Sequence, residues 1–159
     1  RWPAERFGVL SDRLEERGYA RAAVIGPGEE DLGARASVSA AHAVPVLGRD
    51  LDPIGLAALL SRARVVVGND SGPAHLAAAV GTPVVALFGP TDPGRTAPSG
   101  AAVEVLDRFV FCSPCFRKDC PYGHECMREI TVEMVLGAVE RLETRREVIR
   151  GASGPDSVS

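Results

Sequence analysis

Residues 65–75 have the sequence VVVGNDSGPAH, and this stretch decides the fold. Its run of β-branched residues is typical of a buried parallel strand. Pro73 suits the first turn of a helix, because no intrahelical N–H bond is lost there, and Ser71 or Gly72 is the expected cap. We therefore predict a strand that passes directly into a helix. The backbone amides of residues 73–75 are expected to be free at the positive end of the helix dipole, which is a site for phosphate.

Two side chains at this junction can face a bound ligand. Asp70 ends the predicted strand, and His75 lies one turn into the helix. His75 can donate a hydrogen bond to an anion, or it can be a buried imidazole bonded to a nearby carbonyl. Asp70 can accept hydrogen bonds from sugar hydroxyls, or it can only fix the loop and cap the helix. A capped helix that binds nothing is the alternative for the whole junction.

The same alternation of strand and helix extends along the chain. Strands are predicted over residues 22–25, 44–47, 63–67, 84–88 and 103–106, and helices over 3–17, 29–42, from 52 onward, 73–80 and from 131 onward. The third helix is expected to bury Ile54, Leu56, Leu59 and Leu60. Short connections between alternating elements predict an α/β fold, a Rossmann-like parallel sheet with helices on both faces. Ligands of such sheets bind outside the carboxyl ends of the strands.

Length and composition narrow the classes of protein. A chain of 159 residues predicts one domain with a real core. We assign this domain to residues 1–149 and expect residues 150–159 to be a mobile tail. The net charge of −3 gives no basic field for nucleic acid. No stretch reaches the roughly 20 apolar residues of a membrane span, and no signal peptide opens the chain. Because the chain opens without Met, on Arg1, we expect it to be a piece of a longer protein.

Four residues in loops at the expected ligand edge are further candidates. Glu29 can accept hydrogen bonds from the two hydroxyls of a ribose, or it can be a first-turn glutamate favoured by the helix dipole. Leu51 offers an apolar contact to a base, or it packs into the core. Arg49 and Arg95 can neutralise phosphate, or they are solvated surface arginines.

The four cysteines of the chain lie within fifteen residues. They are Cys112, Cys115, Cys120 and Cys126, in the pattern C-x2-C-x4-C-x5-C. Such spacing is typical of a small metal loop, because four thiolates suit tetrahedral zinc or iron. His124 is a spare ligand. Two disulfides or four free thiols are the alternatives.

The central motifs resemble a known family. Residues 67–79, VGNDSGPAHLAAA, and 81–93, GTPVVALFGPTDP, closely resemble the lipopolysaccharide heptosyltransferases of glycosyltransferase family 9. The opening RWPAERF at residues 1–7 and the cysteine segment at 112–127 are similar to the heptosyltransferase II branch. The resemblance implies the C-terminal, donor-binding half of a GT-B glycosyltransferase, an enzyme with two Rossmann-like domains.

The resemblance also implies an activity. Members of this bacterial family transfer heptose from ADP-heptose to the inner core of lipopolysaccharide, with inversion, in the cytoplasm or at the inner face of the inner membrane. No cofactor is implied for the transfer. Carried over by position, the donor-binding residues are Asp70, Ser71, Gly72 and His75 at the diphosphate and heptose, Glu29 at the ribose and Leu51 near adenine.

Some parts of the family pattern are not in this chain. The catalytic aspartate belongs to the N-terminal domain, so no catalytic residue is assigned here and the chain alone is expected to be inactive. The first strand of this half is expected to be truncated. Asp50 and Asp52 stand where the family tends to have neutral or hydroxyl residues. A GT-B-shaped sugar-nucleotide epimerase, which would need an acid–base pair of carboxylates, and a non-catalytic nucleotide-binding module remain as alternatives.

Overall fold

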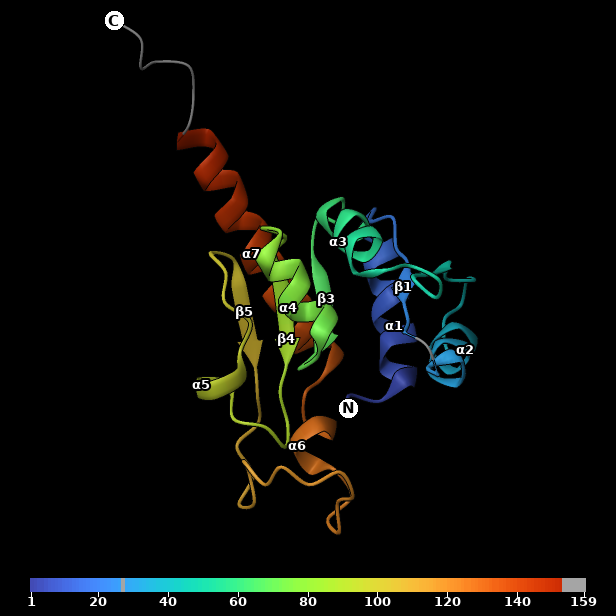
Figure 1. The fold of residues 1–159 in the computed structure, drawn as a ribbon, viewed down its shortest axis with the longest axis vertical. Coiled ribbons are helices and arrows are strands. Elements are labelled where there is room, and N and C mark those ends of the chain that lie inside the picture. The colour runs from blue at the N-terminus through green and yellow to red at the C-terminus, as the bar shows by residue number, and fades with distance from the viewer. Residues whose placement is uncertain (27, 153–159) are drawn as a thin grey trace, which may run out of the picture.

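The structure is a computed structural model that describes residues 1–26 and 28–152, the last four by their backbone. Pro27, in the predicted turn at 26–28, and residues 153–159 of the predicted tail lie outside the described residues. The described elements are α1 (Ala4–Glu15), β1 (Ala23–Val24), α2 (Glu30–Val38), β2 (Val46–Leu47), α3 (Pro53–Ser61), β3 (Val66–Asn69), α4 (Gly72–Ala79), β4 (Val84–Leu87), α5 (Pro93–Thr96), β5 (Val103–Leu106), α6 (Glu125–Arg128) and α7 (Val132–Ala152). The predicted alternation of strands and helices is confirmed (Figure 1).

The strands form two parallel sheets. One has the order β1-β2 and the other β3-β4-β5. The sequence predicts one parallel sheet, whereas the described strands form two, because β1 and β3 are not hydrogen-bonded and none of the described strands lies between them. The parallel arrangement is confirmed, and the carboxyl ends of β3, β4 and β5 point to the same edge, the lower one in Figure 1.

Strand β4 is the centre of the core, with all four residues buried. Successive side chains of a strand point to opposite faces of the sheet. Val85 and Leu87 therefore join a cluster with α1 and α7, whereas Val84 and Ala86 join a cluster with α3 and α4. Helices thus cover both faces of the larger sheet, as predicted, with α4 in front and α7 behind in Figure 1.

Several predicted boundaries are wrong. Strand β3 covers residues 66–69 and not 63–67, because its pairing with β4 runs from Val66 opposite Val84 to Asn69 opposite Leu87. Helix α2 ends at Val38 instead of residue 42. Ile54 is 79% exposed, because α3 buries Leu60 and turns its first residues to solvent.

The last helix begins where the sequence predicts. The Thr131 hydroxyl accepts a hydrogen bond from the Met134 amide at 3.2 Å, which caps α7. Val135, Val139 and Leu142 lie in one buried stripe. The helix continues to Ala152, so residues 150–152 are helical and not part of a tail. In the described part of the chain, no helix is both long and apolar enough to cross a membrane.

Candidate functional site

The junction between β3 and α4 lies at the carboxyl edge of the larger sheet. The Asp70 amide donates to the Leu87 carbonyl at 3.1 Å and so extends the ladder by one residue. Ser71 then has an extended backbone and is the first residue outside α4, with Pro73 in the first turn. The predicted passage from strand to helix is confirmed, and Ser71 is the cap position.

The free amides of this junction are not those that the sequence predicts. Pro73 has no N–H, and the amides of Ala74 and His75 donate to the Ser71 carbonyl at 3.0 and 3.3 Å. Among the described residues, no hydrogen-bond acceptor is found for the amides of Ser71 and Gly72. The Ser71 hydroxyl does not cap the helix, because it donates to the Asn69 carbonyl at 3.0 Å. The free amides therefore lie one to two residues earlier than expected.

Asp70 and His75 lie next to each other. His75 Nε2 is 3.5 Å from Asp70 Oδ1, and the side chains are 45% and 18% exposed. The alternative of a buried imidazole is therefore wrong. The other oxygen of Asp70 accepts a hydrogen bond from the Thr96 hydroxyl at 3.1 Å. Thr96 of α5 thus holds one oxygen of the Asp70 carboxylate, and the other oxygen faces the partly exposed His75 side chain.

Thr96 is a site residue that the sequence reasoning missed. It lies in α5, after Asp92, whose side chain accepts from the Gly94 amide at 2.9 Å and caps this short helix. The sequence Asp92-Pro93-Gly94 does predict the start of a helix in the loop after β4. What no pattern showed was that α5 would bring Thr96 back to Asp70, because the two are separated by 26 residues in sequence.

Glu29 is the residue before α2, at the end of the loop that follows β1, and both of its carboxylate oxygens are already engaged. One oxygen accepts from the Gly26 amide at 3.0 Å, and the other pairs with Arg1. The hydrogen bond from the Gly26 amide lowers the pKa of Glu29, and burial opposes this only in part. Glu29 is thus held charged by the loop in which it stands, with a third of its side chain exposed.

This pKa shift predicts an acid-sensitive contribution to stability. A carboxyl whose pKa is lower in the folded than in the unfolded state stabilises the fold above about pH 4.5 and loses this effect as the pH falls through its folded value. We expect the free energy of unfolding of Glu29→Gln to fall less between pH 6 and pH 3 than that of the unmodified protein, as measured by urea unfolding. Glu30→Gln is the matched control for the lost charge, and the prediction is contradicted if both variants follow the unmodified protein.

Leu51 lines a second part of the site, a cavity of about 330 Å³ beyond the end of β2. The cavity is also lined by Val46, Leu47, Arg49 and Asp50, and both Leu47 and Leu51 are close to half exposed. Leu51 is therefore not tucked into the core. Arg49 is at this cavity, whereas Arg95 is an exposed residue of α5.

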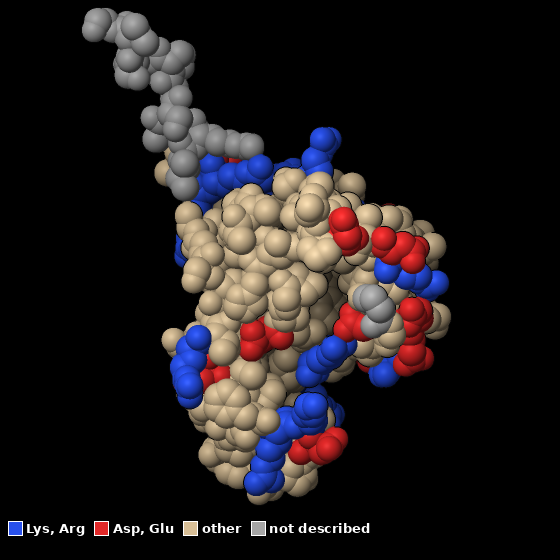
Figure 2. Space-filling view, viewed as in Figure 1, with Lys and Arg blue, Asp and Glu red and all other residues tan. Residues whose placement is uncertain are grey.

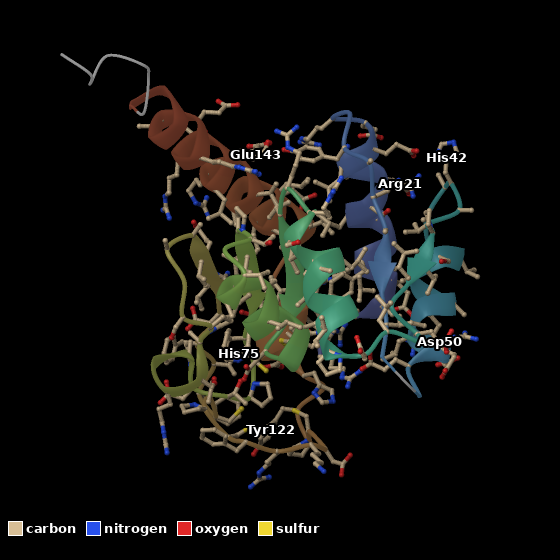
Figure 3. The ribbon with its side chains drawn as sticks, turned by 45° about the horizontal axis from the view of Figure 1, so that its top comes forward. Arg21, His42, Asp50, His75, Tyr122 and Glu143 are labelled. Atoms are coloured by element: carbon tan, nitrogen blue, oxygen red, sulfur yellow. The ribbon has the colours of Figure 1, made fainter. Side chains whose placement is uncertain are left out.

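The figures show how these parts share one edge. In Figure 3 His75 lies just above Tyr122 of the cysteine segment, and Asp50 lies across the view to the right. Figure 2 shows few charged side chains over α4, with basic and acidic groups gathered over α1 and α2 and over the cysteine segment. Figure 2 also shows an acidic patch just below α4, and Asp70 is itself part of the junction, so the surface around the helix start is not free of negative charge.

Comparison with known proteins decides the family. The sequence profile of glycosyltransferase family 9 (heptosyltransferase) matches residues 1–125. The chain belongs to glycosyltransferase family 9. Lipopolysaccharide heptosyltransferase 1 of Pseudomonas aeruginosa is 36% identical over 121 residues, which are 76% of this chain and 34% of that protein.

Two solved structures share the fold of this family 9 chain. The glycosyl transferase family 9 structure from Veillonella parvula has a TM-score of 0.77 at 28% identity, over 91% of this chain and 42% of its own. The E. coli heptosyltransferase WaaC with ADP has a TM-score of 0.67 at 28% identity, over 89% of this chain and 40% of its own. The family 9 chain described here thus spans between a third and a half of the length of these three relatives.

The cysteine segment of this family 9 chain is attached to the same edge. The amides of Cys115 and Phe116 donate to the Pro90 carbonyl at 3.0 and 2.8 Å, and the Ser113 hydroxyl donates to the Gly89 carbonyl. No disulfide joins any of the four cysteines in this structure. Burial raises the pKa of the Cys126 thiol. The alternative of two disulfides is not seen in this structure. The loop after β4 contains Thr96, and its first residues, Gly89 and Pro90, are hydrogen-bonded to the cysteine segment.

Proposed function

We propose that this chain is the donor-binding half of an inverting glycosyltransferase that transfers heptose from ADP-heptose to the inner core of lipopolysaccharide. The observation that carries the proposal is the pair of free amides at Ser71 and Gly72, at the start of α4 on the carboxyl edge of a parallel sheet. Membership of the family supports the class of reaction. A related heptosyltransferase has been solved with ADP, which supports the choice of nucleotide.

The diphosphate is assigned to this helix start. The two amides would each donate to a phosphate oxygen, and the dipole of α4 favours negative charge at this end. A methyl group built on Gly72 would meet no atom within 4 Å, so the backbone is open on that side. His75 would donate to the diphosphate or the heptose, and Asp70 would accept from sugar hydroxyls while Thr96 fixes its other oxygen.

The adenosine is assigned to the loops after β1 and β2. Glu29 would accept from ribose hydroxyls through the lone pairs that Gly26 and Arg1 leave free. The cavity of about 330 Å³ would take the adenine ring, because Leu47 and Leu51 offer it apolar surface and Arg49 and Asp50 offer polar groups. Small-molecule sites commonly combine such apolar walls with a few polar groups.

The chemistry follows from the charge that develops on the leaving group. As the bond between the anomeric carbon and the diphosphate breaks, negative charge grows on ADP. The free amides and the helix dipole would stabilise this charge more in the transition state than in the bound donor. We propose that transfer needs no metal for this reason. Inversion requires the acceptor hydroxyl to attack from the opposite face, and we assign the base that activates it to another part of the complete enzyme.

We propose that the complete enzyme acts at the cytoplasmic side of the inner membrane. The acceptor is anchored there by its lipid, so the enzyme needs to reach a membrane surface without spanning it. Peripheral association at the inner face is consistent with the absence of a membrane-crossing helix in the described part of the chain.

The test is the choice between nucleotides. We expect calorimetric titration to show binding of ADP and ADP-heptose, and weaker binding of UDP and UDP-sugars, because the cavity beside Leu51 is assigned to a purine. Equal affinities for ADP and UDP would remove the donor assignment. Binding of ADP without any transfer to the acceptor by the complete enzyme would favour a non-catalytic nucleotide-binding module instead.

A further inference from the structure

Residues 107–124 form neither helix nor strand. An ordinary loop with aromatic residues buries them, but this loop leaves its aromatic side chains exposed. The large aromatic side chains point outward: Phe109, Phe111, Phe116 and Tyr122 are 79%, 77%, 56% and 49% exposed. Cys112, Cys115 and Cys120 are each more buried than these, and Cys126, which follows, is buried. Phe111 and Tyr122 pack edge to face, with ring centroids 4.9 Å apart, but both rings stay exposed. A loop of this length that buries so little aromatic surface needs another source of order.

The four cysteines share one space. All of them line a single small cavity, together with Pro90, Val110 and residues of the segment such as Arg117 and His124. The cavity has a volume of about 10 Å³. This is the size of one water-sized occupant. This volume suits one metal ion.

The backbone already has features of a thiolate site. The amide of His124 donates to Cys120 Sγ at 3.3 Å, and hydrogen bonds of this kind stabilise negative charge on sulfur. Arg117 lines the same cavity and offers positive charge against thiolates.

We propose that Cys112, Cys115, Cys120 and Cys126 bind one zinc ion through four thiolates. Tetrahedral tetrathiolate coordination, with Zn–S distances near 2.3 Å, is a common structural zinc site. Each thiol loses its proton to solvent as the ion binds. Among the described residues, the one group of acidic, His or Cys side chains with ligand atoms already within 4.8 Å of one another is Asp12, Glu15 and His42. The four sulfurs therefore have to close on the ion by side-chain rotation.

The role of the ion is structural. Cys115 and Phe116 are bonded to the Pro90 carbonyl, and the loop that begins at Pro90 continues to Thr96, which holds Asp70. A zinc ion would therefore fix the shape of the cysteine segment, which is hydrogen-bonded to the loop that contains Thr96. The proposal does not depend on which nucleotide or sugar binds there.

The experiment is metal analysis of the protein purified without chelator. We expect about one zinc per chain, and X-ray absorption with four sulfur neighbours near 2.3 Å. Cys120→Ser is expected to lose most of the zinc and to lower the melting temperature. Asp119→Asn, at the neighbouring exposed residue, and His124→Ala are expected to keep it. Cobalt substitution provides a second readout, because thiolate-to-cobalt absorption bands require the sulfur ligands even if a variant folds poorly.

Several results would overturn the proposal. Zinc below a tenth of an ion per chain, two disulfides found by mass spectrometry, or zinc that Cys120→Ser retains would each exclude the tetrathiolate site. Loss of zinc from His124→Ala with nitrogen in the absorption spectrum would replace one thiolate by the imidazole and exclude the four-cysteine ligand set. A failure of ADP binding would leave all these outcomes unchanged, so the two proposals are tested separately.

Discussion

Replacing Phe88 by alanine is expected to lower the free energy of unfolding by about 3–5 kcal/mol, the usual cost of removing a fully buried phenylalanine. Phe88 follows β4 directly, its side chain is 0% exposed, and its amide continues the ladder to the Leu106 carbonyl. Its neighbours in this cluster include Ala74, Ala77 and Ala78. Alanine has no side-chain rotamers, so these residues cannot turn to fill the space, and a cavity remains.

Urea unfolding followed by circular dichroism measures this loss. Phe109→Ala is the matched control, because Phe109 is 79% exposed and its removal should change stability by no more than about 0.5 kcal/mol. Phe88→Leu should fall between the two. A loss below about 1 kcal/mol for Phe88→Ala would show that the cluster under α4 is not packed as described.

Replacing His75 by alanine is expected to weaken the binding of ADP by roughly 5- to 150-fold, which corresponds to about 1–3 kcal/mol for a hydrogen bond to a charged group. His75 projects from the first turn of α4, beside the free amides, and its side chain is 45% exposed. Because the imidazole packs little, the fold should tolerate its loss. The effect should therefore appear in affinity and not in stability.

Calorimetric titration of ADP measures the effect, with thermal unfolding as the check on the fold. His42→Ala is the matched control, because His42 is a second exposed histidine that pairs with Glu15 and lies at the opposite end of the molecule from His75 (Figure 3). His42→Ala should bind ADP as the unmodified protein does. If His75→Ala also keeps its affinity, His75 does not contact the donor and the assignment of the site loses its main side chain.

The local elements of the fold could be predicted because their causes are local. Asp52 and Pro53 start α3, with the Asp52 carboxylate accepting from the Gly55 amide at 2.7 Å. Thr131 starts α7 in the same way. Strand β5 has the predicted bounds, and the helix after the 65–75 stretch begins within one residue of the prediction. Capping residues, prolines and the spacing of apolar residues act over a few positions, so their effects can be predicted from the sequence alone.

The residues at the strand–helix junction could be named from the sequence, but their hydrogen bonds could not. The edge of the sheet, Asp70, Ser71, Gly72 and His75 follow from the strand–helix junction alone. The identity of the free amides does not, because it depends on which carbonyl the first turn of α4 uses, and the Ser71 carbonyl takes two of the expected donors. Their roles toward a donor stay predictions.

The sequence by itself determined the alternation of elements, the helix starts, the family and the edge at which a phosphate would bind. The tertiary structure decided the split into two sheets, the shift of β3 by its pairing with β4, and the contact between Thr96 and Asp70. It also brought four cysteines to one cavity while their aromatic neighbours turned outward. These features join residues far apart in the chain, and long-range contacts depend on packing and hydrogen-bond pairing that no local pattern encodes.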